Sequence, residues 1–306
     1  MPKKRKSADD DLFLPMELPE QEKAVSEPLV KPLNNPLWTK NKARLIERYL
    51  YYFVLVTHHG TYIDGFAGPQ KDGKPEMWAA KLVLESEPRW LRHFYLYDIG
   101  KKQVNALKRL KEEQPERNSK NRKINREIHV QRGNFNECAL DLLASGEIKQ
   151  KEATFCLLDQ RTFECRWATL KALAEYKTSG NKIELFYFLA IHWLKRAQAG
   201  IKHTERLEQW WGRDDWRNLL SIGTEECKEL FVNRIKKELG YKSVKPWPIY
   251  MKQGGGAIMY YMIHATDHPQ APMLMRRAYE NAVKPKEPFE QMSLLEFIAD
   301  VQPDKN

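Results

Sequence analysis

The sequence predicts an α/β fold with a doubly wound, mostly parallel sheet that ends in a β-hairpin. Short apolar runs alternate with segments of helical periodicity between residues 38 and 190, which is the pattern of repeated strand–helix units. The apolar runs are almost unbroken, as expected for parallel strands that helices cover on both faces. Two further apolar segments flank the glycines of residues 254–256, and this pattern predicts the closing hairpin.

The predicted elements follow one another in the order that a doubly wound sheet requires. Apolar residues recur at helical spacing through residues 38–57 and predict the first helix. The strands that we expect next are residues 61–63, 93–98, 127–135 (a strand together with its turn), 153–160 and 182–190. The helices between them are residues 76–87, 101–113, 136–146 and 165–177. A polar helical insertion, about residues 191–240, then interrupts the alternation before the hairpin.

We expect one main domain with a segment on either side. Residues 1–36 combine a basic start, an acidic patch and repeated prolines, so we expect an extended or partly disordered arm. The main domain covers residues 37–290, including the insertion. Residues 291–306 are expected to form a C-terminal tail.

The chain is basic, and the excess charge is uneven. Its net charge is +10, from 51 basic and 41 acidic residues. Residues 101–132, from Lys101 to Arg132, hold eleven basic and four acidic residues. Such a segment could bind nucleic acid, because phosphate neutralisation supplies most sequence-independent affinity. The alternative is a solvated helix face followed by a mobile loop.

Composition also bounds the compartment and the kinds of site that we expect. No apolar run is long enough to span a bilayer and no signal sequence opens the chain, so we expect a cytoplasmic protein that does not enter membranes. The four cysteines lack the spacing of a zinc site, so we expect reduced, mostly buried thiols and no metal. We expect Cys165 to be a buried helix residue rather than a nucleophile, because reactivity needs a lowered pKa.

The segment of residues 61–70, TYIDGFAGPQ, is the strongest pointer to function. A β-branched and aromatic run ends in Asp64 and breaks into a turn with two glycines, which lets the backbone approach a ligand closely. Asp98 and Asp159 end two later apolar runs. Carboxylates at the carboxyl ends of parallel strands meet in the crevice where α/β sheets bind nucleotide-like cofactors. The alternative is that these acids only cap the following helices.

Several ordered motifs together resemble the three-Cys-motif partner protein family. They are YIDGFAGP, the strand that ends in Asp98, RGNFN at residues 132–136, the strand that ends in Asp159, and the hairpin YMKQGGGAIMYYMIHATDHP. The resemblance covers about residues 38–280. Members of that family are bacterial proteins with a Rossmann-like, class I methyltransferase-like sheet, named for an adjacent gene whose product carries a three-cysteine motif. The resemblance implies S-adenosylmethionine as cofactor and the three-Cys-motif protein as partner.

The resemblance also implies a role for each residue of the matching motifs. The turn would surround the methionine part of S-adenosylmethionine with Asp64, Gly65, Phe66, Ala67, Gly68 and Pro69. Asp98 would hold the ribose hydroxyls, because a carboxylate can accept hydrogen bonds from both. Asn134 and Phe135 would contact the adenine. Asp159 and Gln160 would face the methyl acceptor at the end of the fourth strand.

Two departures from the family pattern leave two functions open. Gln70 stands where the family places a glycine, and its side chain could crowd the cofactor. Residues 159–163 read Asp-Gln-Arg-Thr-Phe instead of Asp-Pro-Phe-Gly, and Arg161 suits a phosphate better than a neutral base edge. The first function is an S-adenosylmethionine-dependent methyltransferase acting on a nucleic acid or another anionic substrate. The second is a catalytically altered methyltransferase-fold protein that serves as the binding partner of a three-Cys-motif protein.

Overall fold

The computed structural model describes residues 41–71, 73–117, 123–197, 204–252 and 255–282 of the chain. The expected arm, residues 1–36, and the expected tail, residues 291–306, lie outside the described residues. The limits of the main domain therefore stay a prediction.

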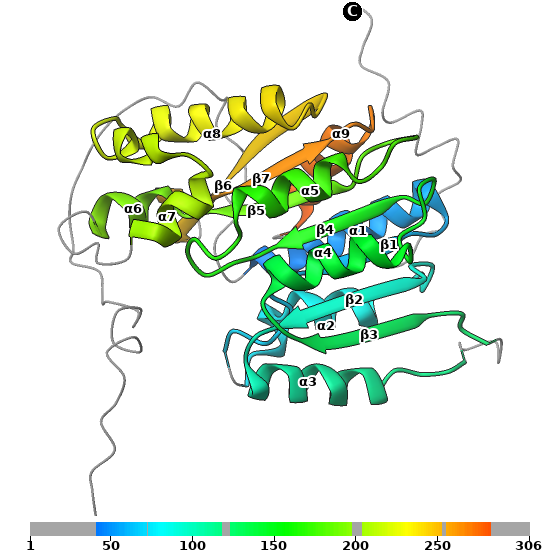
Figure 1. Cartoon of the computed structure of the whole chain (residues 1–306). Coiled ribbons are helices and arrows are strands. Elements are labelled where there is room, and N and C mark those ends of the chain that lie inside the picture. Colours follow the sequence, from blue (N-terminus) through cyan, green and yellow to red (C-terminus); the bar gives the residue numbers. More distant parts are fainter. Residues whose placement is uncertain (1–40, 72, 118–122, 198–203, 253–254, 283–306) are drawn as a thin grey trace, which may run out of the picture. The chain divides into compact units, whose positions relative to one another are not determined.

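Seven strands form one mostly parallel sheet (Figure 1). They are β1 (Thr61–Asp64), β2 (His93–Asp98), β3 (Glu127–Arg132), β4 (Thr154–Leu158), β5 (Glu184–Leu189), β6 (Ser243–Lys252) and β7 (Gly255–Thr266). Their order in space is β3-β2-β1-β4-β5-β7-β6. Neighbours among β1 to β5 pair in parallel, and β7 pairs antiparallel with both β5 and β6. The predicted fold class, a doubly wound Rossmann-like sheet that ends in a hairpin, is confirmed.

Helices cover both faces of this sheet (Figure 1). They are α1 (Lys42–Thr57), α2 (Ala79–Glu85), α3 (Lys101–Glu112), α4 (Phe135–Ser145), α5 (Trp167–Glu175), α6 (Ile191–Ala197), α7 (Thr204–Trp211), α8 (Thr224–Glu238) and α9 (Ala271–Asn281). In one layer α1 contacts both α9 and α2, and in the other α5 contacts both α4 and α7. Every residue of β1, β4 and β5 is buried, which agrees with the unbroken apolar runs of their sequences.

The helical insertion between β5 and β6 is confirmed and belongs to the core. It comprises α6, α7, a 3₁₀ helix η5 (Asp214–Leu220) and α8. Trp210, Trp211 and Trp216 are all buried. The ring of Trp210 stacks on Phe231 with centroids 5.8 Å apart, and its indole N–H donates to the Tyr187 hydroxyl at 2.6 Å. These tryptophans therefore pack the insertion against the sheet.

One element differs from the sequence prediction for a local reason. The helix expected at residues 76–87 is divided into a 3₁₀ helix η3 (Pro75–Met77) and α2, because Trp78 between them has extended backbone angles. The third strand ends at Arg132, and the turn expected with it follows. Asn134 lies beyond it and caps α4, since its side chain accepts a hydrogen bond from the backbone N–H of Asn136.

Candidate functional site

Three strand-end carboxylates meet at one edge of the sheet. Asp64 ends β1, Asp98 ends β2 and Asp159 follows β4 directly. β1 lies between β2 and β4 in parallel pairing, so the carboxyl ends of all three strands lie side by side. The strand order reverses between β1 and β4, and such a switch point is where open α/β sheets bind their ligands. The structure thus brings together the three acids that the sequence singles out.

Asp64 is almost completely buried and is bonded within its own strand and turn. Its carboxylate accepts hydrogen bonds from the Tyr62 hydroxyl at 2.8 Å and from the backbone N–H of Phe66 at 3.1 Å. Burial raises the pKa of the Asp64 carboxyl to about 7, and the charges of Asp159 and Asp98 add to the rise while the two hydrogen bonds oppose it. This carboxyl therefore gains and loses its proton near neutral pH.

Asp98 holds the glycine turn against the end of β2. One carboxylate oxygen accepts from the backbone N–H of Gly68 at 3.1 Å, and the other from that of Gly100 at 2.8 Å. A Cβ on Gly68 would lie 2.5 Å from the Asp98 carboxylate and 2.3 Å from Cβ of Gln103, closer than side-chain atoms approach. Only glycine fits at this position, because the turn rests directly on the acid and on α3.

The rest of the turn, residues 65–69, is fixed by the surrounding backbone. The N–H of Gly65 donates to a β4 carbonyl at 3.1 Å, and that of Ala67 donates to the Tyr97 carbonyl at 2.8 Å. The Ala67 carbonyl in turn accepts from the indole N–H of Trp78 at 2.6 Å. The predicted cofactor turn is therefore ordered by its own fold.

Asp159 is held between Lys42 and Gln70. The Lys42 ammonium lies 2.6 Å from Oδ1, and the Gln70 side-chain amide donates to Oδ2 at 3.1 Å. The ammonium also lies 5.5 Å from the ring centre of Phe188 and 5.6 Å from that of Tyr260, which adds a cation–π attraction. Burial lowers the pKa of Lys42, but the attraction of Asp159 together with smaller contributions from Tyr260 and Asp64 outweighs it, and the net shift is upward. A charged ammonium therefore occupies the place beside Asp159.

Lys42 is a residue that the sequence argument missed. It lies 117 residues before Asp159 and joins it only because α1 crosses the sheet. A signal was available: Lys42 precedes Leu45, Ile46 and Tyr49 at helical spacing, so it lies on the apolar face of α1. A lysine on a buried helix face needs a buried acid as its partner.

Gln160 and Asn134 use their side chains inside the protein. The Gln160 amide donates to the Phe188 carbonyl at 3.1 Å and accepts from the Cys165 backbone N–H at 2.7 Å, and the side chain is buried. Asn134 accepts from both the backbone and the side chain of Asn136. The roles expected of both residues toward acceptor and adenine stay predictions.

Phe135 lies under the turn as a core residue. Its ring centre is 6.0 Å from that of Phe66 and 5.6 Å from that of Tyr97, and the residue is buried. A Cβ on Gly65 would lie 2.8 Å from the Phe135 ring. Packing against the Phe135 ring therefore accounts for the glycine at position 65, and no cofactor is needed to explain it.

The prediction that the cysteines are buried is confirmed, although Cys165 lies just before α5 rather than within it. All four cysteines are buried and unpaired with one another. Burial raises the pKa of the Cys165 thiol well above its ordinary value, and the nearby Glu164 charge adds to the effect. Cys165 therefore has the surroundings of a core residue and not of a nucleophile.

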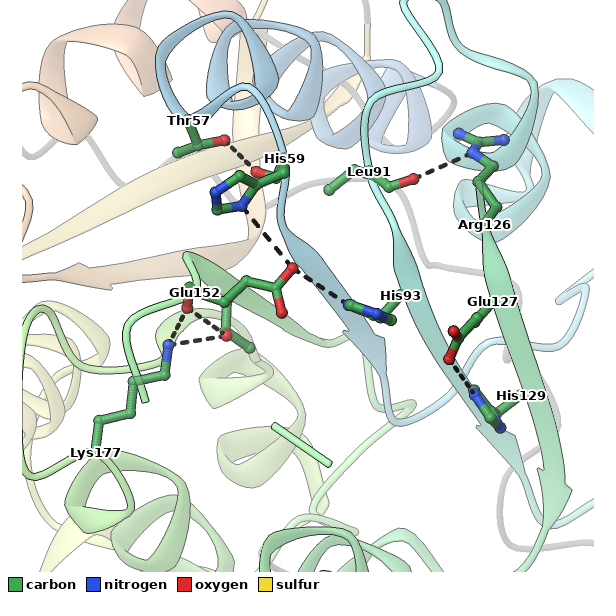
Figure 2. A network of polar contacts seen from close by, with 10 residues as sticks. Thr57, His59, Leu91, His93, Arg126, Glu127, His129, Glu152 and Lys177 are labelled. Carbon is green, nitrogen blue, oxygen red and sulfur yellow. Dashed lines mark hydrogen bonds and ion pairs between the residues drawn. The ribbon is translucent and has the colours of Figure 1, made fainter. Parts of the chain in front are cut away.

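A second polar cluster lies at the opposite, amino-terminal edge of the sheet (Figure 2). The Glu152 carboxylate lies 3.2 Å from Nδ1 of His93 and 3.9 Å from Nδ1 of His59. Lys177 donates to the Glu152 carbonyl and, at 2.9 Å, to the Thr154 hydroxyl. Burial lowers the pKa of Lys177 to about 8, although the Glu152 charge opposes this. The cluster ties the strand starts together on the side away from the candidate site.

The basic segment is described only in part. In α3 the apolar Val104, Leu107 and Leu110 are buried while its basic residues face solvent. Residues 118–122 lie outside the described residues. In the described part of the chain, no helix is long and apolar enough to cross a membrane.

Comparison with known proteins adds little to this picture. No family model matches the chain, and a search of curated proteins finds no match. A solved structure of protein LPL1258 from Legionella pneumophila, assigned to the family model DUF519, aligns over 80% of this chain and 91% of that one. The TM-score is 0.43 and the identity 10%, a likeness too slight to support an argument about function. The structure itself defines the class: a Rossmann-like α/β protein with a cluster of carboxylates at the switch point of its sheet.

Proposed function

We propose that this chain is a methyltransferase-like protein that binds S-adenosylmethionine at the carboxyl edge of its sheet, as the three-Cys-motif partner resemblance implies. The observation that supports the proposal most is the meeting of Asp64 and Asp98 on both sides of a glycine turn at the switch point. This is the position at which doubly wound sheets bind nucleotide-like ligands.

The residues present fit the polar groups of this cofactor. Asp64 would offer its carboxylate to the ammonium group of the ligand. That positive charge would stabilise the deprotonated form of Asp64. Asp98 has oxygen lone pairs beyond those used by Gly68 and Gly100, so it can accept from ribose hydroxyls. S-adenosylmethionine supplies an electrophilic methyl group when bound. The chain itself supplies the binding and orientation of the reactants.

Asp159 is proposed to position an acceptor rather than to take its proton. Its carboxylate is already paired with the Lys42 ammonium and accepts a hydrogen bond from the Gln70 side chain, so both of its oxygens are engaged within the protein. We propose that methyl transfer to a nucleic acid or another anionic substrate relies on holding the two reactants close together.

The Lys42–Asp159 pair also favours a second candidate function. A buried ion pair at the end of β4 fills the place where an acceptor would contact Asp159. A methyltransferase-fold protein without transfer activity, acting as the binding partner of a three-Cys-motif protein, would need no acceptor there.

Isothermal titration calorimetry with S-adenosylmethionine and S-adenosylhomocysteine tests the proposal. The full chain is expected to bind both ligands. Asp98→Asn is expected to weaken binding by about tenfold or more, because hydrogen bonds to a charged acceptor contribute about 1.5 to 3 kcal/mol. Asp141→Asn, a change at an exposed carboxylate of α4, serves as the matched control. A folded chain that binds neither ligand would overturn the proposal, whereas binding without transfer to DNA, RNA or protein acceptors would favour the second function.

A further inference from the structure

A basic groove runs from the glycine turn to α3. It has a volume of about 340 Å³, and its lining includes Lys71, Lys74, Lys81, Arg109 and Trp78. Pro69, the last residue of the turn, lies at one end of the lining, so the groove begins beside the candidate cofactor site. Three separate segments supply the lining: the stretch after the turn, α2 and α3.

The charges of this groove are available to a ligand. Among its described lining residues there are four cationic side chains and one acid, Glu113. Lys81 pairs with Glu85 one helical turn further on. Lys71, Lys74 and Arg109 are exposed, and none of them makes an ion pair with a described residue. Exposed cations that line one groove attract phosphates, and Arg109 in addition can bind a phosphate with two nitrogens.

Trp78 gives the groove an aromatic surface held in place. Its indole N–H donates to the Ala67 carbonyl at 2.6 Å, which fixes the ring, and the residue is only partly buried. A fixed aromatic ring beside cations is how single-stranded nucleic acid is bound without sequence preference: bases stack on the ring while the backbone follows the charges. A duplex hides its bases from such a ring.

The positive surface continues along α3 beyond the groove. Five basic residues of this helix are exposed to solvent: Lys101, Lys102, Lys108, Arg109 and Lys111. A nucleic-acid strand that extends beyond the groove would therefore contact further cations and not the apolar side of the helix. Long-range attraction of this kind also raises association rates.

We infer that single-stranded nucleic acid binds in this groove, with phosphates on Lys71, Lys74 and Arg109 and a base stacked on Trp78. The binding does not depend on the cofactor. Its relation to methyl transfer, by which the groove would lead a substrate to the carboxyl edge, rests on the proposed function.

Fluorescence anisotropy with a labelled single-stranded oligonucleotide, measured over a series of salt concentrations, tests the inference. Lys74→Glu/Arg109→Glu is expected to weaken binding by at least about tenfold at low salt and to lower the salt slope by roughly 0.7 for each phosphate that the variant no longer neutralises. Lys236→Glu/Lys237→Glu makes the same charge change at exposed positions of α8 and is the matched control. Equal affinities of the two double variants would overturn the inference.

Trp78 separates stacking from charge. Trp78→Leu is expected to weaken binding by roughly tenfold, while Trp78→Phe keeps an aromatic face and retains most of the affinity. Thermal melting shows whether each variant is folded. If the folded Phe variant loses as much affinity as the Leu variant, or if a duplex of the same length binds as tightly, the stacking assignment is wrong.

Two further measurements test whether other phosphate-bearing ligands bind in the groove. A mononucleotide that displaces the oligonucleotide at equal concentration would overturn the polymer assignment, and so would anionic lipid vesicles whose binding has the same dependence on Lys74 and Arg109. Calorimetry on the groove variants distinguishes this inference from the proposed function. Oligonucleotide binding that depends on the groove, in a chain that binds no S-adenosylmethionine, supports the inference while refuting the proposed function.

Discussion

The Lys42 ammonium and the Asp159 carboxylate form a buried ion pair with 2.6 Å between Nζ and Oδ1. The pair joins the first turn of α1 to the end of β4 at the candidate site. A buried ion pair as a whole contributes little to the free energy of unfolding. Removing only one partner lowers that free energy strongly, because the remaining charge stays buried without a partner.

The first prediction concerns this asymmetry. Lys42→Met is expected to lower the free energy of unfolding by about 3 to 5 kcal/mol, because it leaves the Asp159 charge unpaired. Asp159→Asn leaves the Lys42 charge buried without a partner. It is expected to lower the free energy of unfolding by a similar amount, so this change also destabilises the fold. The double variant is expected to lose much less than the two single losses added together. Urea denaturation measures all three, with Lys151→Met at an exposed position as control. Additive losses would show that the pair is not coupled.

The second prediction is a pH dependence that comes from Asp64. Its pKa is about 7 in the folded chain and about 3.9 for an unperturbed Asp, so between these values the folded state holds the proton more tightly. The free energy of unfolding is therefore expected to fall as pH rises from about 4 to 7, by at most about 1.4 kcal/mol per pH unit from this group.

Asp64→Asn cannot titrate and is expected to remove this slope. Denaturation at several pH values between about 4 and about 7, the range that the two pKa values bracket, compares it with the parent and with Asp141→Asn, whose carboxylate is exposed. A parent slope that persists unchanged in Asp64→Asn would assign the pH dependence to another group.

The third prediction tests whether Gly65 is required by packing alone. Gly65→Ala brings a Cβ to 2.8 Å from the Phe135 ring and is expected to destabilise the fold by about 1 to 3 kcal/mol. Adding Phe135→Leu is expected to recover part of the lost stability, because the smaller side chain leaves room for the new Cβ. Gly223→Ala, where an added Cβ meets nothing within 4 Å, is the control. If the second change brings no recovery, the clash is not the cause.

The sheet was predictable because each strand carries its own signal. The buried runs of β4 and β5 are nearly all apolar, and their lengths and turn residues fix strand rather than helix. The hairpin of β6 and β7 was likewise predictable, from two strand-like segments on either side of a glycine run. The grouping of Asp64, Asp98 and Asp159 followed from topology alone, since parallel strands end at one edge.

The partners of these acids could not be predicted in the same way. Lys42 and Gln70 reach Asp159 only through the packing of α1 and of the turn, and no local pattern records which side chain meets which acid. The hydrogen bonds of the Gln160 side chain could not be predicted for the same reason. They join it to β5 and to the segment before α5, which lie near it only in the folded chain.

The fourth prediction concerns Gln70, whose amide donates to Asp159 at 3.1 Å. This bond holds the residue after the turn against the end of β4. Gln70→Gly removes the bond and the side-chain volume, so the turn gains freedom to open over a ligand and S-adenosylmethionine is expected to bind several-fold more tightly. Gln70→Ala keeps an ordinary backbone and isolates the loss of the side chain. Calorimetry on parent and both variants measures the affinities. Equal affinity in all three would mean that Gln70 does not restrict the site, and that its contact with Asp159 serves the fold alone.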